Sequence, residues 1–408
     1  MRYKIVLTCI LIFFTIFTIQ YLLATNGSFH FEHDVDYFNP LARSFIQGRL
    51  DIPNPIEVHD LSLFKGKWYP YWGPIPAILL IPWQLVLGRY VPANYLSIFF
   101  GSLNVVIVWL ILRRINREFF PDKNCKLLNA VLVIFFALGT SHVYVATKSG
   151  VWYVSQIVSL TPILIAFWIL LKRKLSLADY FLASTLISSS LLNRLSLILY
   201  FALIIFRIVE NYFFDQSKKL VIKRLMVCLI PYLVFFLIFG LYNYMRFGSF
   251  LGNGVAYHNH GQSLKVVPYG LFSYKYILRN LELIFLEIPK LQTVNGQESI
   301  SFNREGLSIF FVSPVYLFAF LSLKSLKQIK QRETRWIIYF WITTLLLLVP
   351  IVLIFSPGLY QFGIRYSLDF SIILIALTYI GLRGKVNLLL FSFLAMSVIL
   401  NVASKYFL

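Results

Sequence analysis

Acidic residues are scarce in this sequence. Among 408 residues there are 17 Asp and Glu against 37 Lys and Arg, and charged residues make up 13% of the chain. A typical soluble domain carries about 25% charged residues. Because 59% of the residues are hydrophobic and the mean hydropathy is +0.74, the composition excludes an ordinary soluble domain and predicts a polytopic membrane protein.

Cysteine is also rare, and several catalytic signatures are missing. Cys9, Cys125 and Cys228 have no spacing that suits a zinc site or a redox pair, so we expect no structural disulfide. The sequence contains no glycine-rich phosphate loop, Walker pattern, GxSxG motif or zinc signature. It therefore shows no machinery for nucleotide-driven chemistry.

The net charge of +20 raises the question of a nucleic-acid partner. Lys and Arg, however, occur in short segments between apolar runs and not on one basic face, which argues against nucleic acid. Cytoplasmic loops of membrane proteins retain positive charge, so we assign these segments to the cytoplasmic side. They are residues 2–4, 113–126, 172–174, 207–224, 324–335 and 383–385.

The apolar runs between these segments must then cross the membrane in alternating directions. A helix needs about 20 residues to cross a bilayer, and the runs approach or reach that length. We expect an all-α fold of about eleven transmembrane helices in a single domain, 1–408, with the N-terminus inside and the C-terminus outside. The expected spans are 4–23, 92–112, 128–147, 151–171, 178–192, 194–208, 225–243, 306–322, 336–355, 366–382 and 387–403.

Residues 178–208 are the least regular part of this pattern. The stretch is too long for one helix and short for two, and "LLNRLS" interrupts it. A hairpin of two short helices would place Asn193 and Arg194 near the outer surface or in a water-filled recess, because an Arg exposed to lipid costs several kcal/mol.

Two large segments, 24–91 and 244–305, are expected to form outer loops. Within the first, residues 73–88 ("GPIPAILLIPWQLVLG") are apolar but short and contain Pro76 and Pro82. This pattern favours an interfacial or re-entrant helix over a span. All six histidines fall on the predicted outer side or at outer helix ends, so we expect polar chemistry to be concentrated there.

Two of the few carboxylates, Asp34 and Asp36, directly follow the first predicted helix in "FEHDVDYF". In an extended segment both would point to one face. A carboxylate near an apolar cavity can act as a general base or ligate a divalent cation. A solvated acidic loop explains the same spacing as well.

Aromatic rings are concentrated in residues 61–76, "LSLFKGKWYPYWGPIP", and include Trp68, Tyr69 and Tyr71. An aromatic belt at headgroup level accounts for most of these rings, and a platform that stacks a sugar or binds a lipid headgroup is the alternative. His258 has i, i+2 spacing with His260 in "YHNHG". Because no third ligand is evident, a flexible polar loop is favoured there over a metal site.

Three arginines are expected at outer helix ends, where the positive-inside trend disfavours them. They are Arg194, Arg246 and Arg365, and Tyr366 follows the last of them. The planar guanidinium group suits phosphate oxygens. The alternative is that each arginine pairs locally with a carboxylate such as Asp369 or Glu305.

Five segments of the chain, taken in order, carry a family resemblance. They are "DVDYFNPLARSFIQGRLDI", "GKWYPYWGPIPAILLIP", "YNYMRFGSFLGNG", "REGLSIFFVSPVYLF" and "QFGIRYSLDF". Together they resemble the GT-C superfamily of integral-membrane glycosyltransferases, and most of all the subgroup related to dolichyl-phosphate-mannose protein mannosyltransferases. The likeness covers most of the chain as a pattern of helices and loops.

The resemblance implies an active site at the outer face and a sugar on a polyprenyl phosphate as donor. It assigns Asp34 or Asp36 as catalytic base or metal ligand. It assigns the lipid-phosphate contacts to Arg246 and Arg365, with Arg194 as a weaker candidate. Because "HDVD" lacks the contiguous "DE" of some members, the resemblance does not choose between the two aspartates or decide whether a divalent cation is used.

We therefore expect a multi-pass plasma-membrane enzyme that transfers a sugar to a lipid, glycan or protein acceptor. The reaction needs cationic stabilisation of the leaving phosphate and a base for the acceptor hydroxyl. Tyr366 is expected near the phosphate, and Trp68, Tyr69, Tyr71 and His258 are expected to contact the sugar or the acceptor. The main alternative is a transporter or flippase of a lipid-linked or small polar substrate, since intramembrane charges also mark transport paths. A membrane scaffold is a third option.

Overall fold

The structure is a computed structural model that describes residues 2–31, 35–259, 268–294, 297–326 and 331–404. Its α-helices are α1 (Arg2–Ala24), α2 (Phe38–Ile46), α3 (Ile75–Leu87), α4 (Ala93–Phe119), α5 (Lys126–Leu138), α6 (Ser141–Thr147), α7 (Val151–Leu170), α8 (Leu177–Ser188), α9 (Phe201–Asp215), α10 (Lys218–Phe247), α12 (Ile277–Phe285), α13 (Ile309–Val312), α14 (Arg332–Leu353), α15 (Leu368–Leu382) and α16 (Leu388–Ala403). The 3-10 helices are η1 (Ser189–Leu192), η2 (Leu195–Tyr200), η3 (Val255–Tyr257), η4 (Tyr274–Tyr276), η5 (Pro314–Ser325) and η6 (Arg365–Ser367). Two antiparallel hairpins pair β1 (Leu61–Phe64) with β2 (Lys67–Pro70) and β3 (Lys290–Val294) with β4 (Gln297–Ser301).

Several of these helices are long enough to cross a membrane. Among the described residues, seven helices qualify by length and hydropathy, and the count is eight if α5 and α6, bent by 50°, form one span. The remaining predicted spans coincide with the shorter apolar helices α8 with η1, η5 and α16. The structure thus shows a mostly helical protein with several candidate spans, and eleven crossings stay a prediction. The fold is compatible with the expected all-α class, and the predicted outer segments also contain two short β-hairpins.

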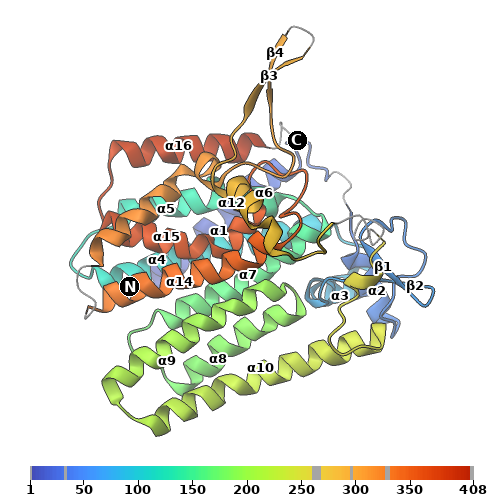
Figure 1. The fold of residues 1–408 in the computed structure, drawn as a ribbon, viewed down its shortest axis with the longest axis horizontal. Helices are drawn as coiled ribbons and strands as arrows, with labels where there is room; N and C mark the ends of the chain where they lie inside the picture. The colour runs from blue at the N-terminus through green and yellow to red at the C-terminus, as the bar shows by residue number, and fades with distance from the viewer. Residues whose placement is uncertain (1, 32–34, 260–267, 295–296, 327–330, 405–408) are drawn as a thin grey trace.

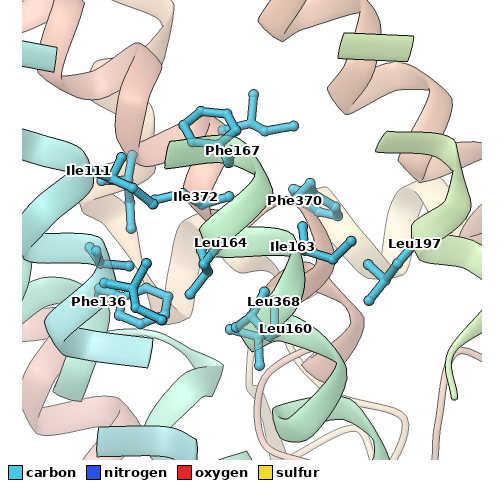
Figure 2. Packing of buried hydrophobic residues seen from close by; sticks show 14 of the residues in the cluster. Ile111, Phe136, Leu160, Ile163, Leu164, Phe167, Leu197, Leu368, Phe370 and Ile372 are labelled. Atoms are coloured by element: carbon cyan, nitrogen blue, oxygen red, sulfur yellow. The ribbon is translucent and has the colours of Figure 1, made fainter. Parts of the chain in front are cut away.

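Helices α7 and α15 form the centre of the bundle. Their candidate spans are 83% and 89% buried, whereas those of α1 and α10 are 11% and 17% buried. A helix that is apolar all round, as α15 is, becomes stable in a fold when other helices cover it. Figure 2 shows Ile163 and Leu164 of α7 in the same buried cluster as Phe370 of α15. The exposed apolar sides of α1 and α10 are surfaces that a bilayer would cover.

The basic segments meet at one end of the bundle, on the left of Figure 1. Lys123 Nζ donates a hydrogen bond of 2.9 Å to the carbonyl of Arg383, and Arg207 donates one of 2.7 Å to the carbonyl of Lys172. Arg332 lies 3.1 Å from Glu118. Segments far apart in the sequence therefore share this end, as the alternation of charged loops predicts.

The two long polar segments meet at the opposite end, where α2, α3 and the β1–β2 hairpin lie in Figure 1. The expected interfacial segment forms α3, which leaves Trp83 and Val86 exposed at 56% and 80%. The predicted outer segment 244–305 begins later than expected, because α10 continues to Phe247. That segment carries the β3–β4 hairpin, which projects away from the helices (Figure 1).

Gly73 allows the start of α3 to pack closely on the helical hairpin of residues 177–215. A Cβ on Gly73 would lie 1.9 Å from the carbonyl oxygen of Leu192, so no larger residue fits without moving the backbone. Because Leu192 ends η1, this contact brings the first outer segment next to Asn193 and Arg194. The expected hairpin of two helical arms is therefore present, and it supports the candidate site described next.

Candidate functional site

Backbone hydrogen bonds join distant segments at the outer end of the bundle. The amide of Val151 donates to the carbonyl of Val35 at 3.1 Å, and the amide of Asn259 donates to the carbonyl of Leu61 at 2.7 Å. The first contact ties the chain after α1 to the start of α7. The second ties residues 253–259 to the β1–β2 hairpin. Together they hold parts of both predicted outer segments against the bundle.

Asp36 is engaged at the start of α2. Its Oδ1 accepts hydrogen bonds from the amides of Phe38 at 2.9 Å and Asn39 at 3.1 Å, and its Oδ2 accepts one from Asn39 Nδ2 at 2.5 Å. An aspartate that accepts from the first amides of a helix stabilises that helix terminus. Asp36 thus has a structural role as well as a predicted catalytic one. Asp34 lies outside the described residues.

Arg194 pairs with a carboxylate, as the alternative interpretation proposed. Its Nε lies 2.9 Å from both carboxylate oxygens of Asp369, and Nη2 lies 2.7 Å from Oδ2. Gln156 donates to the same carboxylate at 3.1 Å. The Asp369 side chain is 2% exposed and that of Arg194 is 16% exposed. The carboxylate of Asp369 therefore compensates the charge of Arg194. The sequence pattern instead predicts that water at the outer surface or in a recess would solvate this charge.

Arg246 is engaged within the protein. Its Nη1 donates to the carbonyl of Pro70 at 2.6 Å, and Nη2 donates to Asn243 Oδ1 at 2.8 Å. The guanidinium carbon lies 3.8 Å from the centre of the Tyr242 ring, and the residue is 3% exposed. These contacts attach the end of α10 to β2, and the expected phosphate contact stays a prediction.

Arg365 differs from both. Its Cζ lies 5.5 Å from the ring centre of Tyr153 and 5.0 Å from that of Tyr366. Within the part of the chain that the structure describes, its guanidinium makes no ion pair. The backbone is held, since the carbonyl of Arg365 accepts a hydrogen bond of 2.9 Å from Gln156. Arg365 is thus a half-buried cation on a fixed backbone, and it lies near two aromatic rings. It has no carboxylate partner among the residues that the structure describes.

Tyr366 lies between two of the cations. Its ring centre is 4.6 Å from Cζ of Arg194 and 5.0 Å from Cζ of Arg365. The negative face of an aromatic ring attracts a guanidinium group. Tyr366 therefore helps to hold both arginines at one level of the bundle, and its place beside a phosphate group stays a prediction.

Tyr71 and His258, two predicted contact residues, are brought together. Their ring centres lie 5.0 Å apart, and Tyr71 stacks on Trp72 at 3.9 Å. Burial raises the pKa of the Tyr71 hydroxyl well above its usual value, and the charge of Asp60 raises it further, whereas Arg365 and Arg194 oppose the shift. Tyr71 is therefore neutral, and it lies within the electrostatic reach of both the carboxylate and the arginines.

Trp68 and Tyr69 lie elsewhere on the hairpin. Trp68 pairs with Leu63 across the hairpin, and its carbonyl accepts a hydrogen bond of 2.8 Å from Ile52. Tyr69 packs edge-on against Phe247 of α10, with ring centres 5.3 Å apart. The structure places these two rings at the packing of the outer segment on α10 and does not bring them to Tyr71.

Several polar residues at this site were not singled out from the sequence. Asp60 lies with its Oδ1 3.3 Å from Nε2 of His258. Gln156 bonds both Asp369 and the carbonyl of Arg365. No local motif marks either residue, because each acquires its role from a partner about two hundred residues away. The sequence offers one general signal, the scarcity of carboxylates. Because there are few of them, each aspartate near an apolar segment is a candidate for a structural or functional role.

An apolar cavity of about 200 Å³ lies next to the hairpin break. Helices α3, α4, α7 and α8 supply its walls through residues such as Leu79, Phe100, Val158 and Leu186, and Asn193 lies at its border. Because Asn193 directly precedes Arg194, the cavity adjoins the cluster of Arg194, Tyr366 and Arg365. An apolar chain attached to an anionic group would meet both environments here.

Metal ligation was left open for the acidic residues. Among the described residues, no group of three His, Cys, Asp or Glu side chains gathers closely enough to hold a metal ion. Of the residues for which metal ligation was considered, Asp36 and His258 are described and belong to no such group, whereas Asp34 and His260 lie outside the described residues. The three cysteines are free thiols.

The chain was compared with known proteins in three ways. No protein-family model, curated protein or solved structure matches it. The resemblance to GT-C glycosyltransferases therefore depends on the segments described above, and the site must be interpreted from its own geometry.

Proposed function

We propose that this chain is a membrane glycosyltransferase that transfers a sugar from a polyprenyl-phosphate donor to an acceptor at the extracytoplasmic face of the plasma membrane. The observation that carries the proposal is Arg365, a half-buried cation without a carboxylate partner in the described chain, beside Tyr71 and Tyr366. Such a group suits the charge that develops on a leaving phosphate. The acceptor is a lipid, a glycan or a protein.

The surroundings of Arg365 support a lipid-linked donor. The apolar cavity beside Asn193 has the character that a polyprenyl chain requires. The cations next to it have the character that a phosphate requires. Among the described residues these two environments adjoin at the end of the bundle opposite the basic loops, where a lipid-linked sugar would meet its acceptor.

The Arg194–Asp369 pair has a supporting role in this proposal. The carboxylate neutralises Arg194 and leaves Arg365 as the cation available to the phosphate. Gln156 connects Asp369 to the backbone of Arg365. The pair therefore orients Arg365 before the donor binds, which is the preorganisation that electrostatic catalysis needs.

The chemistry balances without nucleotide hydrolysis. The acceptor oxygen forms a bond to the anomeric carbon of the sugar, while the bond from that carbon to the phosphate oxygen breaks. The electron pair stays on the polyprenyl phosphate, whose charge Arg365 stabilises. The proton of the acceptor hydroxyl passes to a base.

The test is transfer of label from a panel of polyprenyl-phosphate sugars by purified protein in liposomes that contain candidate acceptor lipids and glycans. We expect label to move from one donor to an acceptor. Parallel reactions with a chelator decide whether a divalent cation takes part. Movement of intact donor across the liposome membrane without sugar transfer would contradict the proposal and establish a flippase.

A further inference from the structure

We infer that His258 and Asp60 form the general base that takes the proton from the acceptor hydroxyl. This inference rests on the proposed glycosyl transfer and adds the identity of the base. The base combines Asp60 of the first outer segment with His258 of the second. The inference also assigns a positioning role to Asp60, a residue that the sequence pattern did not single out.

The two side chains form a close pair in a mostly buried place. His258 Nε2 lies 3.3 Å from Asp60 Oδ1, and the side chains are 12% and 10% exposed. A carboxylate at this distance stabilises the imidazolium that forms when the histidine takes a proton. The small exposed fraction leaves room for a substrate atom to approach, while most bulk water is excluded.

Both partners are held by the backbone around them. His258 forms an isolated antiparallel bridge with Ser62 of β1, and the next residue, Asn259, donates its amide to the carbonyl of Leu61. The amide of Asp60 donates to the hydroxyl of Tyr37 at 3.4 Å. Burial raises the pKa of Tyr37 to about 12, so this hydroxyl stays neutral. The pair is therefore preorganised by its backbone contacts with β1 and with Tyr37.

A tight turn before His258 fixes this arrangement. Gly254 has a φ of +87°, and a Cβ there would lie 2.3 Å from the ring of Phe247. Its carbonyl accepts a hydrogen bond of 2.8 Å from Ser62. Glycine is the residue that adopts this conformation without strain. The turn thus docks the segment that carries His258 on both β1 and α10.

Tyr71 connects the pair to the cations. The imidazole of His258 packs against its ring at 5.0 Å, and its hydroxyl lies in the fields of Asp60, Arg365 and Arg194. The base and the phosphate-binding cation are therefore both neighbours of one half-buried tyrosine. Displacement at an anomeric carbon needs a base on the acceptor side and charge stabilisation on the leaving-group side. The site supplies both beside Tyr71.

The acceptor oxygen bonds to the anomeric carbon as its proton moves to the imidazole of His258. The bond from the anomeric carbon to the phosphate oxygen breaks, and the electron pair leaves with the polyprenyl phosphate beside Arg365. The imidazolium is stabilised by Asp60 until it returns the proton to water.

The experiment compares His258→Gln and His258→Ala with His59→Gln in the donor-transfer assay. His59 is an exposed histidine in the same outer segment as Asp60, so its variant controls for loss of an imidazole at this face. We expect transfer to fall about 10²- to 10⁴-fold in both His258 variants, which is the usual contribution of a positioned base. The His59 variant should transfer at the wild-type rate.

Chemical rescue distinguishes a base from a structural residue. Imidazole added to His258→Ala should restore part of the transfer, and it should not change the wild-type rate. Asp60→Asn should lower the maximal rate with little change in donor KM, whereas Asp51→Asn, a change at a buried aspartate in the same segment, should not lower it. Donor binding by each variant, measured with a labelled polyprenyl-phosphate sugar, shows that the fold persists.

Two results would overturn the inference. One is a wild-type transfer rate in His258→Gln. The other is a loss of transfer in His258→Ala that imidazole does not restore while donor binding is retained. Both are distinct from failure of the proposed function, in which the wild-type protein itself transfers no sugar.

Discussion

The two ends of the bundle use buried charge in opposite ways. At the basic end Glu210 is 1% exposed and forms an ion pair with Arg207, and Arg332 and Arg335 lie 3.7 and 3.5 Å from the same carboxylate. Arg332 also contacts Glu118 of α4 at 3.1 Å. These contacts join α4, α9 and α14. The charges there hold helices together.

At the outer end the pairing is selective. Arg194 is neutralised by Asp369, and Arg246 is bonded to backbone and amide oxygens. Arg365 lies near the rings of Tyr153 and Tyr366 and makes no ion pair with the residues that the structure describes. The difference shows how a chain with few carboxylates can separate structural from functional cations. A carboxylate that is already surrounded by arginines stabilises the fold, while a cation without such a partner is available to a ligand. The basic end also buries ionic groups, so burial of charge alone does not mark a functional site, and the concentration of polar chemistry at the other end stays a prediction.

The largest effect on stability is expected at the basic end. Glu210→Gln removes the carboxylate that Arg207, Arg332 and Arg335 share and leaves buried arginine charge uncompensated. Loss of one partner of a buried ion pair costs about 3–5 kcal/mol. Unfolding in mixed micelles should show this loss, and the matched control Glu298→Gln on exposed β4 should not. Equal unfolding free energies for the two variants would mean that the cluster does not hold the helices.

The largest effect on function is expected at Arg365. Arg365→Ala should lower transfer about 10²- to 10³-fold, the usual effect of removing a charge-stabilising donor, and it should weaken donor use more than acceptor use. Stability should change little, since the guanidinium makes no ion pair within the described chain. Arg304→Ala is the control, because Arg304 is an exposed outer arginine beside Tyr360. Unchanged dependence on donor concentration in Arg365→Ala would exclude a phosphate contact.

A smaller effect is expected at Asp36. Asp36→Ala removes an acceptor for the first amides of α2 and should cost about 1 kcal/mol of stability. Asp36→Asn retains an acceptor oxygen, so its stability should stay near that of the wild type, and with His258 as the base its transfer should persist. Thermal unfolding and transfer rates measured on the same preparations check both. Loss of transfer in a stable Asp36→Asn protein would restore the base that the sequence pattern predicts.

The smallest effect concerns the ion pair between the exposed Arg49 and the buried Asp51. The hydrogen bond from Arg49 holds the pKa of Asp51 below its ordinary value. A carboxyl group with a lowered folded-state pKa contributes stability above its unfolded-state pKa, and this contribution is lost as the pH falls below about 4 and through the folded value. The wild-type unfolding temperature should therefore fall further than that of Asp51→Asn on acidification. Parallel acid profiles for the two proteins would show that the pair contributes nothing.

Much of the helical framework could be predicted from residue order. Each expected span coincides with a helix or with a pair of adjoining helices, since long apolar runs bounded by basic segments leave few other folds in a membrane. The interruption at Asn193 and the short helix after Gly73 are local features, and the sequence indicated both. The β-hairpins were not expected, because each strand is only four or five residues long and carries no extended alternation.

The sequence by itself determined the class of protein, the helices and the gathering of basic loops at one end, because hydropathy and charge act locally along the chain. Only the tertiary structure decided which charges have partners. Asp369 is 175 residues from Arg194 in the sequence. Asp60 lies close to His258 because His258 forms a bridge with Ser62 of β1. Partners so far apart leave no local pattern, since their distance is set by the packing of whole helices. That packing neutralises Arg194, leaves Arg365 unpaired within the described chain and brings an aspartate and a histidine together beside Tyr71.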